Sequence, residues 1–163
     1  MPLHRITKIY LDMDGVIADF NREYIRQHGI HPRQAEKEKK FEPYFRAMID
    51  NKGFEKLPLM DDAQVGLDYL NKIHIPTEIL SSTARPEVHE DVQEQKINWL
   101  KKHNITFKPI LVPGKRHKKE YARPDTLLID DTEINVKQFI GAGGHAIYHK
   151  DWVTTLAILK LYV

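Results

Sequence analysis

Residues 12–20 read DMDGVIADF and follow directly on the apolar run KIYL at positions 8–11. Two carboxylates, Asp12 and Asp14, therefore stand two positions apart at the end of a segment that is typical of a buried strand. Gly15 comes next, and a glycine there lets the chain turn sharply and lets the backbone approach a ligand. This stretch predicts both the first strand of the fold and the centre of a functional site.

The composition is typical of one soluble globular domain. The chain has 163 residues, of which 41% are hydrophobic, enough for one sizeable core with a small insertion. It has no cysteine, which excludes disulfides, thiolate catalysis and zinc sites built on sulfur. No apolar run approaches the roughly 20 residues of a membrane span, and the segment before the first acidic pair is too short for a signal peptide. We expect a cytoplasmic protein without a membrane partner, and the sequence leaves its oligomeric state open.

Apolar runs alternate with helical patterns along most of the chain. Strands are expected at residues 76–80, 110–112, 127–129 and 146–148, in addition to 6–11. Helices are expected to begin near residues 61, 86, 134 and 152. Strands that alternate with helices predict an α/β fold in which a parallel sheet is covered by helices on both faces.

The segment of residues 21–58 has a different character. It is long, charged and dotted with aromatic residues, and Phe41, Phe45 and Met48 recur at helical spacing. We interpret it as a small helical insertion after the first strand. The remaining residues, 1–20 and 59–163, would then form the core.

Polar residues follow the predicted strands where each strand ends. In an open parallel sheet, ligands bind at the carboxyl ends of the strands, so these residues are expected to converge. A basic segment, residues 114–123, can add a lysine to them. The converging residues would be Asp12, Asp14, Ser81, Ser82, Asp130 and Asp131.

Clustered carboxylates point to metal-assisted phosphoryl chemistry. Such groups repel one another and stay ionised only if a cation shares the site. Hard oxygen ligands favour Mg²⁺ over zinc, and Mg²⁺ often completes its shell with a phosphate. One aspartate can attack phosphorus to form an aspartyl-phosphate. A second, two residues along, can protonate the leaving oxygen and later deprotonate water.

These motifs resemble those of the haloacid dehalogenase (HAD) superfamily of phosphohydrolases. The matching residues are DMDGV at 12–16, ILSS at 79–82, a lysine, and LLIDD at 127–131, in that order. The resemblance implies a Rossmann-like core, Mg²⁺ and phosphoryl transfer through aspartate. Within the superfamily, the chain resembles the 5′(3′)-deoxyribonucleotidase branch, which carries a small helical cap after the first motif. Residues 21–58 occupy that place, and FEKLPLMDDA at 54–63 resembles the return from cap to core.

The resemblance implies roles for the acidic residues. Asp12 would be the nucleophile and Asp14 the general acid and base. Mg²⁺ would be held by Asp12, by the backbone carbonyl of Asp14 and by the pair Asp130 and Asp131. Which member of that pair binds directly is left open, and either can also cap the helix that follows.

The resemblance also implies roles for hydroxyl and basic residues. Ser81, with Ser82 beside it, would hold a phosphoryl oxygen. Lys118 would be the phosphate lysine, with Lys115 and Lys119 as alternatives. Further candidates for substrate contact are Phe20, Arg85 and Lys119, although Arg85 can instead pair with Glu87 or Glu90 and the cap aromatics can be plain core.

We therefore expect a Mg²⁺-dependent phosphatase whose substrate is a (deoxy)nucleoside monophosphate. A sugar phosphate, or a 3′-phosphate at a nucleic-acid end held by residues 114–123, is the alternative substrate. A non-catalytic nucleic-acid-binding module is a third hypothesis. Net charge is only +2, and clustered carboxylates repel a phosphate backbone unless Mg²⁺ intervenes, so nucleic acid is not an expected partner.

Overall fold

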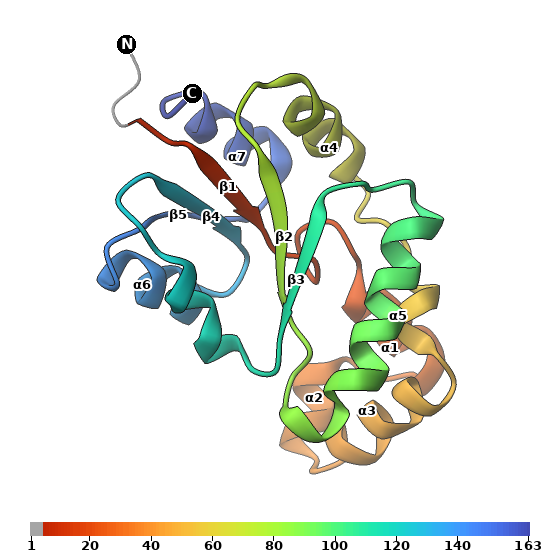
Figure 1. Cartoon of the computed structure of the whole chain (residues 1–163). Helices are drawn as coiled ribbons and strands as arrows, with labels where there is room; N and C mark the ends of the chain where they lie inside the picture. Colours follow the sequence, from red (N-terminus) through yellow and green to blue (C-terminus); the bar gives the residue numbers. More distant parts are fainter. Residues whose placement is uncertain (1–4) are drawn as a thin grey trace.

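The computed structural model describes residues 5–163 and contains one five-stranded sheet (Figure 1). All neighbouring strands in it are parallel, in the order β3-β2-β1-β4-β5. The order reverses beside β1, so the crevice in which such sheets bind ligands opens at the carboxyl ends of β1 and β4. The strands are β1 (Lys8–Leu11), β2 (Thr77–Ser82), β3 (Lys108–Val112), β4 (Thr126–Asp130) and β5 (His145–Tyr148).

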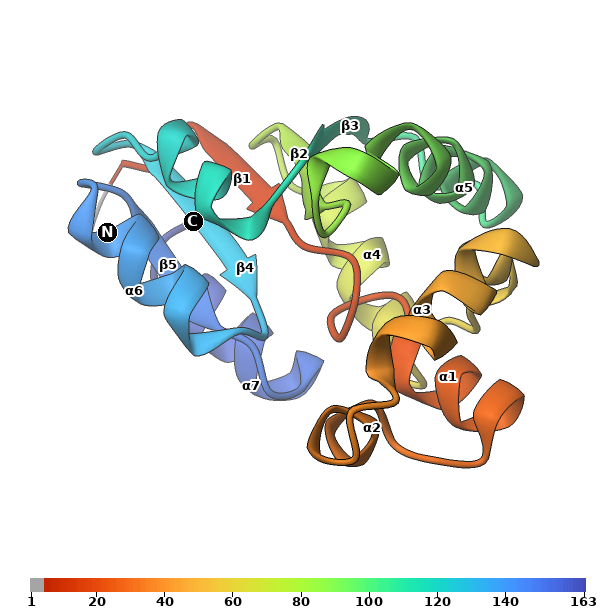
Figure 2. The ribbon, with the colours of Figure 1, turned by 90° about the horizontal axis from the view of Figure 1, so that it is seen from below.

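Helices cover both faces of the sheet, as Figure 2 shows, which confirms the predicted α/β class. Side chains alternate along a strand, so Ile9 and Leu11 face one layer while Tyr10 faces the other. The first layer contains α4 (Ala63–Lys72), α5 (His89–Lys102) and α7 (Trp152–Leu159). The second contains α6 (Glu133–Gly141) and the 3-10 helix η3 (Lys115–Tyr121).

The insertion between β1 and α4 is helical. It contains α1 (Phe20–His28), α2 (Pro32–Lys37), α3 (Phe41–Asp50) and the 3-10 helix η1 (Gly53–Lys56). These helices lie at one end of the molecule, beside α5 (Figure 1). Their aromatic side chains belong to the same apolar cluster as the sheet residues, so the insertion packs against the core.

Two buried tryptophans fix the chain around the first motif. The indole N–H of Trp152 donates to the carbonyl oxygen of Val16 at 2.9 Å. That of Trp99 donates to the carbonyl oxygen of Leu57 at 2.7 Å, where the insertion returns to the core. Gly66 makes room for Trp152, because a methyl group at residue 66 would overlap the indole ring. Both ends of the insertion are therefore held by buried hydrogen bonds.

Some element boundaries differ from those expected. β2 continues through Ser82, because Ser81 and Ser82 pair with β3. β3 begins at Lys108, two residues earlier than expected, since a proline at 109 is tolerated on an edge strand. The helix expected from Pro86 begins as a 3-10 turn, η2 (Pro86–Val88), before α5.

Residues 1–4 lie outside the described residues. They belong to the expected core segment 1–20 and to the N-terminal segment that was judged too short for a signal peptide. Within residues 5–163, no helix has both the length and the apolar character that a membrane span requires.

Candidate active site

A pocket of about 440 Å³ lies at the carboxyl ends of β1 and β2, next to the residues that follow β4. Most of the polar residues singled out in the sequence line it, and side chains of the helical insertion close its other end. The predicted polar residues that line the pocket are Asp12, Asp14, Ser81, Ser82, Lys118 and Asp131.

Lys118 joins the first acidic motif to the last. Its Nζ lies 2.9 Å from Asp12 Oδ1 and 2.8 Å from Asp130 Oδ2, and all three side chains are buried. Burial, and then the charge of Asp130, raise the pKa of Asp12 well above its ordinary value, while Lys118 opposes this. Burial alone would lower the pKa of Lys118, but the two carboxylates raise it, so the ammonium stays charged. Of the three lysines considered, Lys118 is the one that reaches the acids.

The structure distinguishes the two members of the acidic pair. Asp130 is wholly buried, and its oxygens also accept hydrogen bonds from the backbone N–H of Thr132 at 2.9 Å and from Asn135 Nδ2 at 3.1 Å. It therefore caps the turn before α6 while it holds Lys118. Asp131 is only partly buried and lines the pocket. Adjacent residues at the end of a strand point in different directions, which separates these two tasks.

Gly15 permits the close approach of Asp131 to the first motif. The glycine has a φ of +81°, and a methyl group there would overlap the Asp131 carboxylate. Burial, and then the neighbouring charge of Asp130, raise the pKa of Asp131 to about 6. One carboxylate oxygen from each of Asp12, Asp130 and Asp131 lies within 4.8 Å of the others, as the ligands of one metal ion would.

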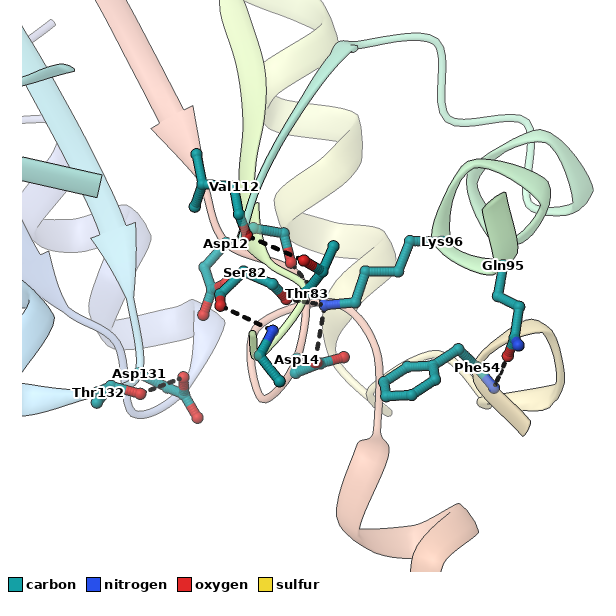
Figure 3. A network of polar contacts seen from close by, with 12 residues as sticks. Asp12, Asp14, Phe54, Ser82, Thr83, Gln95, Lys96, Val112, Asp131 and Thr132 are labelled. Atoms are coloured by element: carbon teal, nitrogen blue, oxygen red, sulfur yellow. Dashed lines mark hydrogen bonds and ion pairs between the residues drawn. The ribbon is translucent and has the colours of Figure 1, made fainter. Parts of the chain in front are cut away.

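A second buried lysine, which the sequence analysis did not single out, lies on the opposite side of the motif. Lys96 of α5 extends its Nζ to within 3.0 Å of Asp14 Oδ2 (Figure 3). The same Nζ lies 2.8 Å from Ser81 Oγ and 2.8 Å from the carbonyl oxygen of Ser82. Its signal in the sequence is a lysine at the helical spacing of Val92 and Trp99, within an otherwise apolar stripe.

The charges of the site leave room for a divalent cation. Four carboxylates face two buried ammonium groups, an excess of two negative charges when all are ionised. In the part of the chain that the structure describes, the buried Oδ1 of Asp14 has no hydrogen-bond partner. Oxygen donors without histidine or sulfur suit a hard cation. The residues present therefore fit a magnesium-type ion.

The hydroxyl groups at the end of β2 border the pocket. Because Ser81 Oγ accepts a hydrogen bond from Lys96, its own hydrogen is free to be donated to a ligand. Ser82 Oγ instead accepts from the backbone N–H of Ala84 at 3.1 Å, and Ala84 has a left-handed φ of 80°. Both serines therefore line the pocket while accepting a hydrogen bond, Ser81 wholly buried and Ser82 partly exposed.

Aromatic rings form the opposite end of the pocket. Phe20, Phe41, Phe45 and Phe54 line it. Phe20 stacks on Phe54 with ring centroids 5.7 Å apart, and Phe41 stacks on Phe45 at 5.4 Å. The pocket is therefore acidic at the strand ends and aromatic at the helical insertion, and Phe20, a candidate for substrate contact, is one of the rings that line it.

Two other candidates for substrate contact lie outside the pocket lining. Both terminal nitrogens of the Arg85 guanidinium lie 2.8 Å from the two carboxylate oxygens of Glu42 on α3. The expected partner Glu87 is more distant, at 3.7 Å. Lys119 is exposed, whereas Lys115 lines the pocket. Arg85 thus joins core to insertion, and Lys119 is not brought to the site.

Solved structures that share this fold include proteins described as HAD hydrolases. A HAD-superfamily hydrolase from Ehrlichia chaffeensis matches with a TM-score of 0.61 and 14% identity, over 98% of each chain. A hydrolase from Streptococcus pneumoniae matches at 0.57 and 16% identity, over 96% of this chain and 99% of its own. A HAD family enzyme from Bacteroides thetaiotaomicron, in complex with magnesium and inorganic phosphate, matches at 0.54 and 16%, over 92% and 98%. At these identities the likeness shows the fold alone.

Sequence comparison identifies the family. Among curated proteins none matches the chain. A family model described as "5′ nucleotidase, deoxy (Pyrimidine), cytosolic type C protein" matches residues 5–151. The match confirms the predicted resemblance to HAD phosphohydrolases of the nucleotidase branch, and it makes the chain a phosphomonoester hydrolase. The chain belongs to the 5′ nucleotidase, deoxy (Pyrimidine), cytosolic type C protein family.

Proposed function

We propose that this protein is a Mg²⁺-dependent 5′(3′)-deoxyribonucleotidase that hydrolyses (deoxy)nucleoside monophosphates through an aspartyl-phosphate. One observation carries the proposal. A single pocket holds clustered carboxylates and a buried lysine at one end and four phenylalanines at the other. A nucleotide has the same division, with an anionic phosphate and an aromatic base.

Mg²⁺ would be held by Asp12 and Asp131, with Asp130 behind them and the backbone carbonyl of Asp14 as a further ligand. The oxygen donors, their separation within 4.8 Å and the unbalanced negative charge support this assignment. The Bacteroides thetaiotaomicron enzyme in complex with magnesium and phosphate supports it as well. When bound, the cation would offset charge on the carboxylates and on the phosphoryl oxygens.

The side chains can then carry out the two steps of hydrolysis. A carboxylate oxygen of Asp12 forms a bond to phosphorus while the ester P–O bond breaks, and Asp14 gives a proton to the departing oxygen. Water next attacks the same phosphorus and gives a proton to Asp14. The bond between phosphorus and Asp12 breaks, and inorganic phosphate leaves. Lys118, and Ser81 through its free hydrogen, would stabilise the phosphoryl oxygens in both steps.

The aromatic end of the pocket supports a nucleotide over a sugar phosphate. A base can stack on Phe20 or Phe41, and such stacking contributes about 1–3 kcal/mol per base in other proteins. A sugar has no aromatic face to offer these rings. Residues 21–58 would serve as the cap that keeps bulk water from the reacting atoms. The family description, which names a cytosolic protein, also supports the expected cytoplasmic location.

The test is phosphate release from a panel of phosphomonoesters, in Mg²⁺ and in EDTA. The panel contains ribo- and deoxyribonucleoside 5′- and 3′-monophosphates, several sugar phosphates and oligonucleotides with a 3′-phosphate. We expect Mg²⁺-dependent turnover concentrated on the mononucleotides. Turnover concentrated on sugar phosphates or on oligonucleotide ends would reject the nucleotide assignment and keep the phosphatase chemistry.

A further inference from the structure

Lys96 uses all of its hydrogen-bonding capacity inside the protein. An ammonium group has three N–H donors, and three acceptors lie within 3.0 Å of Lys96 Nζ: Asp14 Oδ2, Ser81 Oγ and the carbonyl oxygen of Ser82. Among the residues that the structure describes, Lys118 has two such acceptors, Asp12 and Asp130. A phosphate oxygen can therefore take the third donor of Lys118, but it could bind Lys96 only by displacing an existing partner. The two buried lysines are suited to different tasks.

The carboxylate of Asp14 depends on Lys96 for its orientation. Within residues 5–163, Lys96 provides the only hydrogen bond to that carboxylate, at Oδ2, and Oδ1 has no partner. Asp14 is the group proposed to exchange a proton with the leaving oxygen, which requires its carboxylate to be placed to within a fraction of an ångström.

The position of Lys96 is itself fixed. It is 2% exposed, and its Nζ lies 5.6 Å from the ring centre of Phe54. The preceding residue, Gln95, holds α5 against the helical insertion by two hydrogen bonds. Its side chain accepts from the backbone N–H of Phe54 at 3.1 Å (Figure 3) and donates to the carbonyl oxygen of Ile49 at 2.8 Å. The anchored helix and the three hydrogen bonds together fix the position of the Lys96 ammonium group.

We propose that Lys96 is a positioning residue for proton transfer: it holds the Asp14 carboxylate in place for the leaving oxygen. This inference rests on the proposed function, since it assigns a role within that reaction. In the first step, which kcat/KM reports, Asp14 protonates the leaving group, so the effect on kcat/KM depends on how much each ester needs that proton. The later transfer of a proton from water to Asp14 is common to all esters.

The test compares two esters in wild type and in K96M, which keeps most of the side-chain volume and loses the ammonium. With a nucleoside monophosphate, whose alkoxide leaving group needs a proton, kcat/KM should fall about 100-fold, at the low end of the usual range for general acid catalysis. With p-nitrophenyl phosphate, whose leaving group departs unprotonated, the fall should be below about tenfold. K101M, an exposed lysine on the same helix, is the matched control and should behave as wild type.

Two further measurements exclude a structural effect. The rise in Tm produced by Mg²⁺ should persist in K96M if the acidic cluster remains assembled. In a D14N background, K96M should cause no further loss with p-nitrophenyl phosphate, because the residue through which it acts has been changed. Should K96M fail to fold, K96R makes the same ester comparison, since a planar guanidinium cannot meet the same three acceptors.

Equal losses of kcat/KM on both esters, or a raised KM with kcat unchanged, would overturn the inference and make Lys96 a structural residue or a phosphate ligand. A wild-type protein that hydrolyses neither ester would instead overturn the proposed function, and the inference with it.

Discussion

The two ends of the pocket are built on different principles. The acidic end draws side chains from five separate parts of the chain, and hydrogen bonds donated by two lysines hold them at 2.8–3.0 Å. The aromatic end comes from residues 20–54 alone. Its rings are held by non-directional apolar packing, with ring centres 5.4–6.5 Å apart. Directional contacts leave one arrangement, whereas ring packing tolerates several. Changes at the acidic end should therefore alter the chemistry, and changes at the aromatic end should alter the choice of substrate.

The largest effect is expected from D12N at the acidic end. It removes the proposed nucleophile but keeps the side-chain size, so kcat should fall by about four orders of magnitude or more, as in enzymes that lose a covalent nucleophile. Circular dichroism and Tm should show an intact fold, because a carboxylate buried among other acids is not needed for stability. Residual activity within a hundredfold of wild type would reject Asp12 as the nucleophile.

The next effect concerns charge repulsion in the metal-free protein. The pKa of Asp131 is raised to about 6 from an ordinary value of 3.8, so the folded state is penalised above pH 6 and the penalty disappears as the pH falls to 3.8. At pH 8 in EDTA, D131N should therefore raise the free energy of unfolding by about 3 kcal/mol. The gain should vanish near pH 4, as measured by urea unfolding at both pH values.

Addition of Mg²⁺ should make wild type more stable than D131N, the reverse of the order in EDTA. Wild type should gain stability when Mg²⁺ is added, because the cation offsets the same repulsion, while D131N should gain little and lose most of its activity. D50N, an exposed aspartate at the end of α3, should show neither effect. If D131N were less stable than wild type in EDTA at pH 8, the carboxylate would be a structural group and not a site for a cation.

The acidic end could be predicted from sequence because its motifs are local. Each acid or serine follows an apolar strand, and the topology of a parallel sheet brings strand ends together. The separate tasks of Asp130 and Asp131 could not be predicted, because they depend on which way each side chain leaves the strand. Lys96 was missed because its contact with Asp14 spans 82 positions of sequence and belongs to no strand end.

The aromatic end could be predicted only as a helical segment. The spacing of Phe41 and Phe45 indicates a helix, and α3 is present. Which rings line a pocket depends on how the insertion packs on α5, and helical periodicity does not contain that information. The pair formed by Arg85 and Glu42 is a further long-range contact, between residues 43 positions apart.

A moderate effect is expected from F20L at the aromatic end. Leucine keeps an apolar side chain but removes the ring face, so KM for a nucleoside monophosphate should rise about tenfold, within the measured range of base stacking. The kcat for p-nitrophenyl phosphate should stay within about threefold of wild type, since the acidic end is unchanged. F107L, a partly buried phenylalanine outside the pocket, is the control. An equal loss of kcat on both substrates would show that the two ends are not separable.

The smallest effects should come from the ion pair that links the two regions. The side chain of Glu42 is 63% exposed and that of Arg85 34%, so E42Q should lower the free energy of unfolding by no more than about 1 kcal/mol. If Arg85 serves only as this link, R85M should match E42Q in both stability and KM. If Arg85 leaves Glu42 to bind substrate, R85M should raise KM about tenfold while E42Q lowers it, because a competing carboxylate is then removed. Steady-state kinetics of the two variants, side by side, therefore decides whether Arg85 belongs to the site or to the contact between core and insertion.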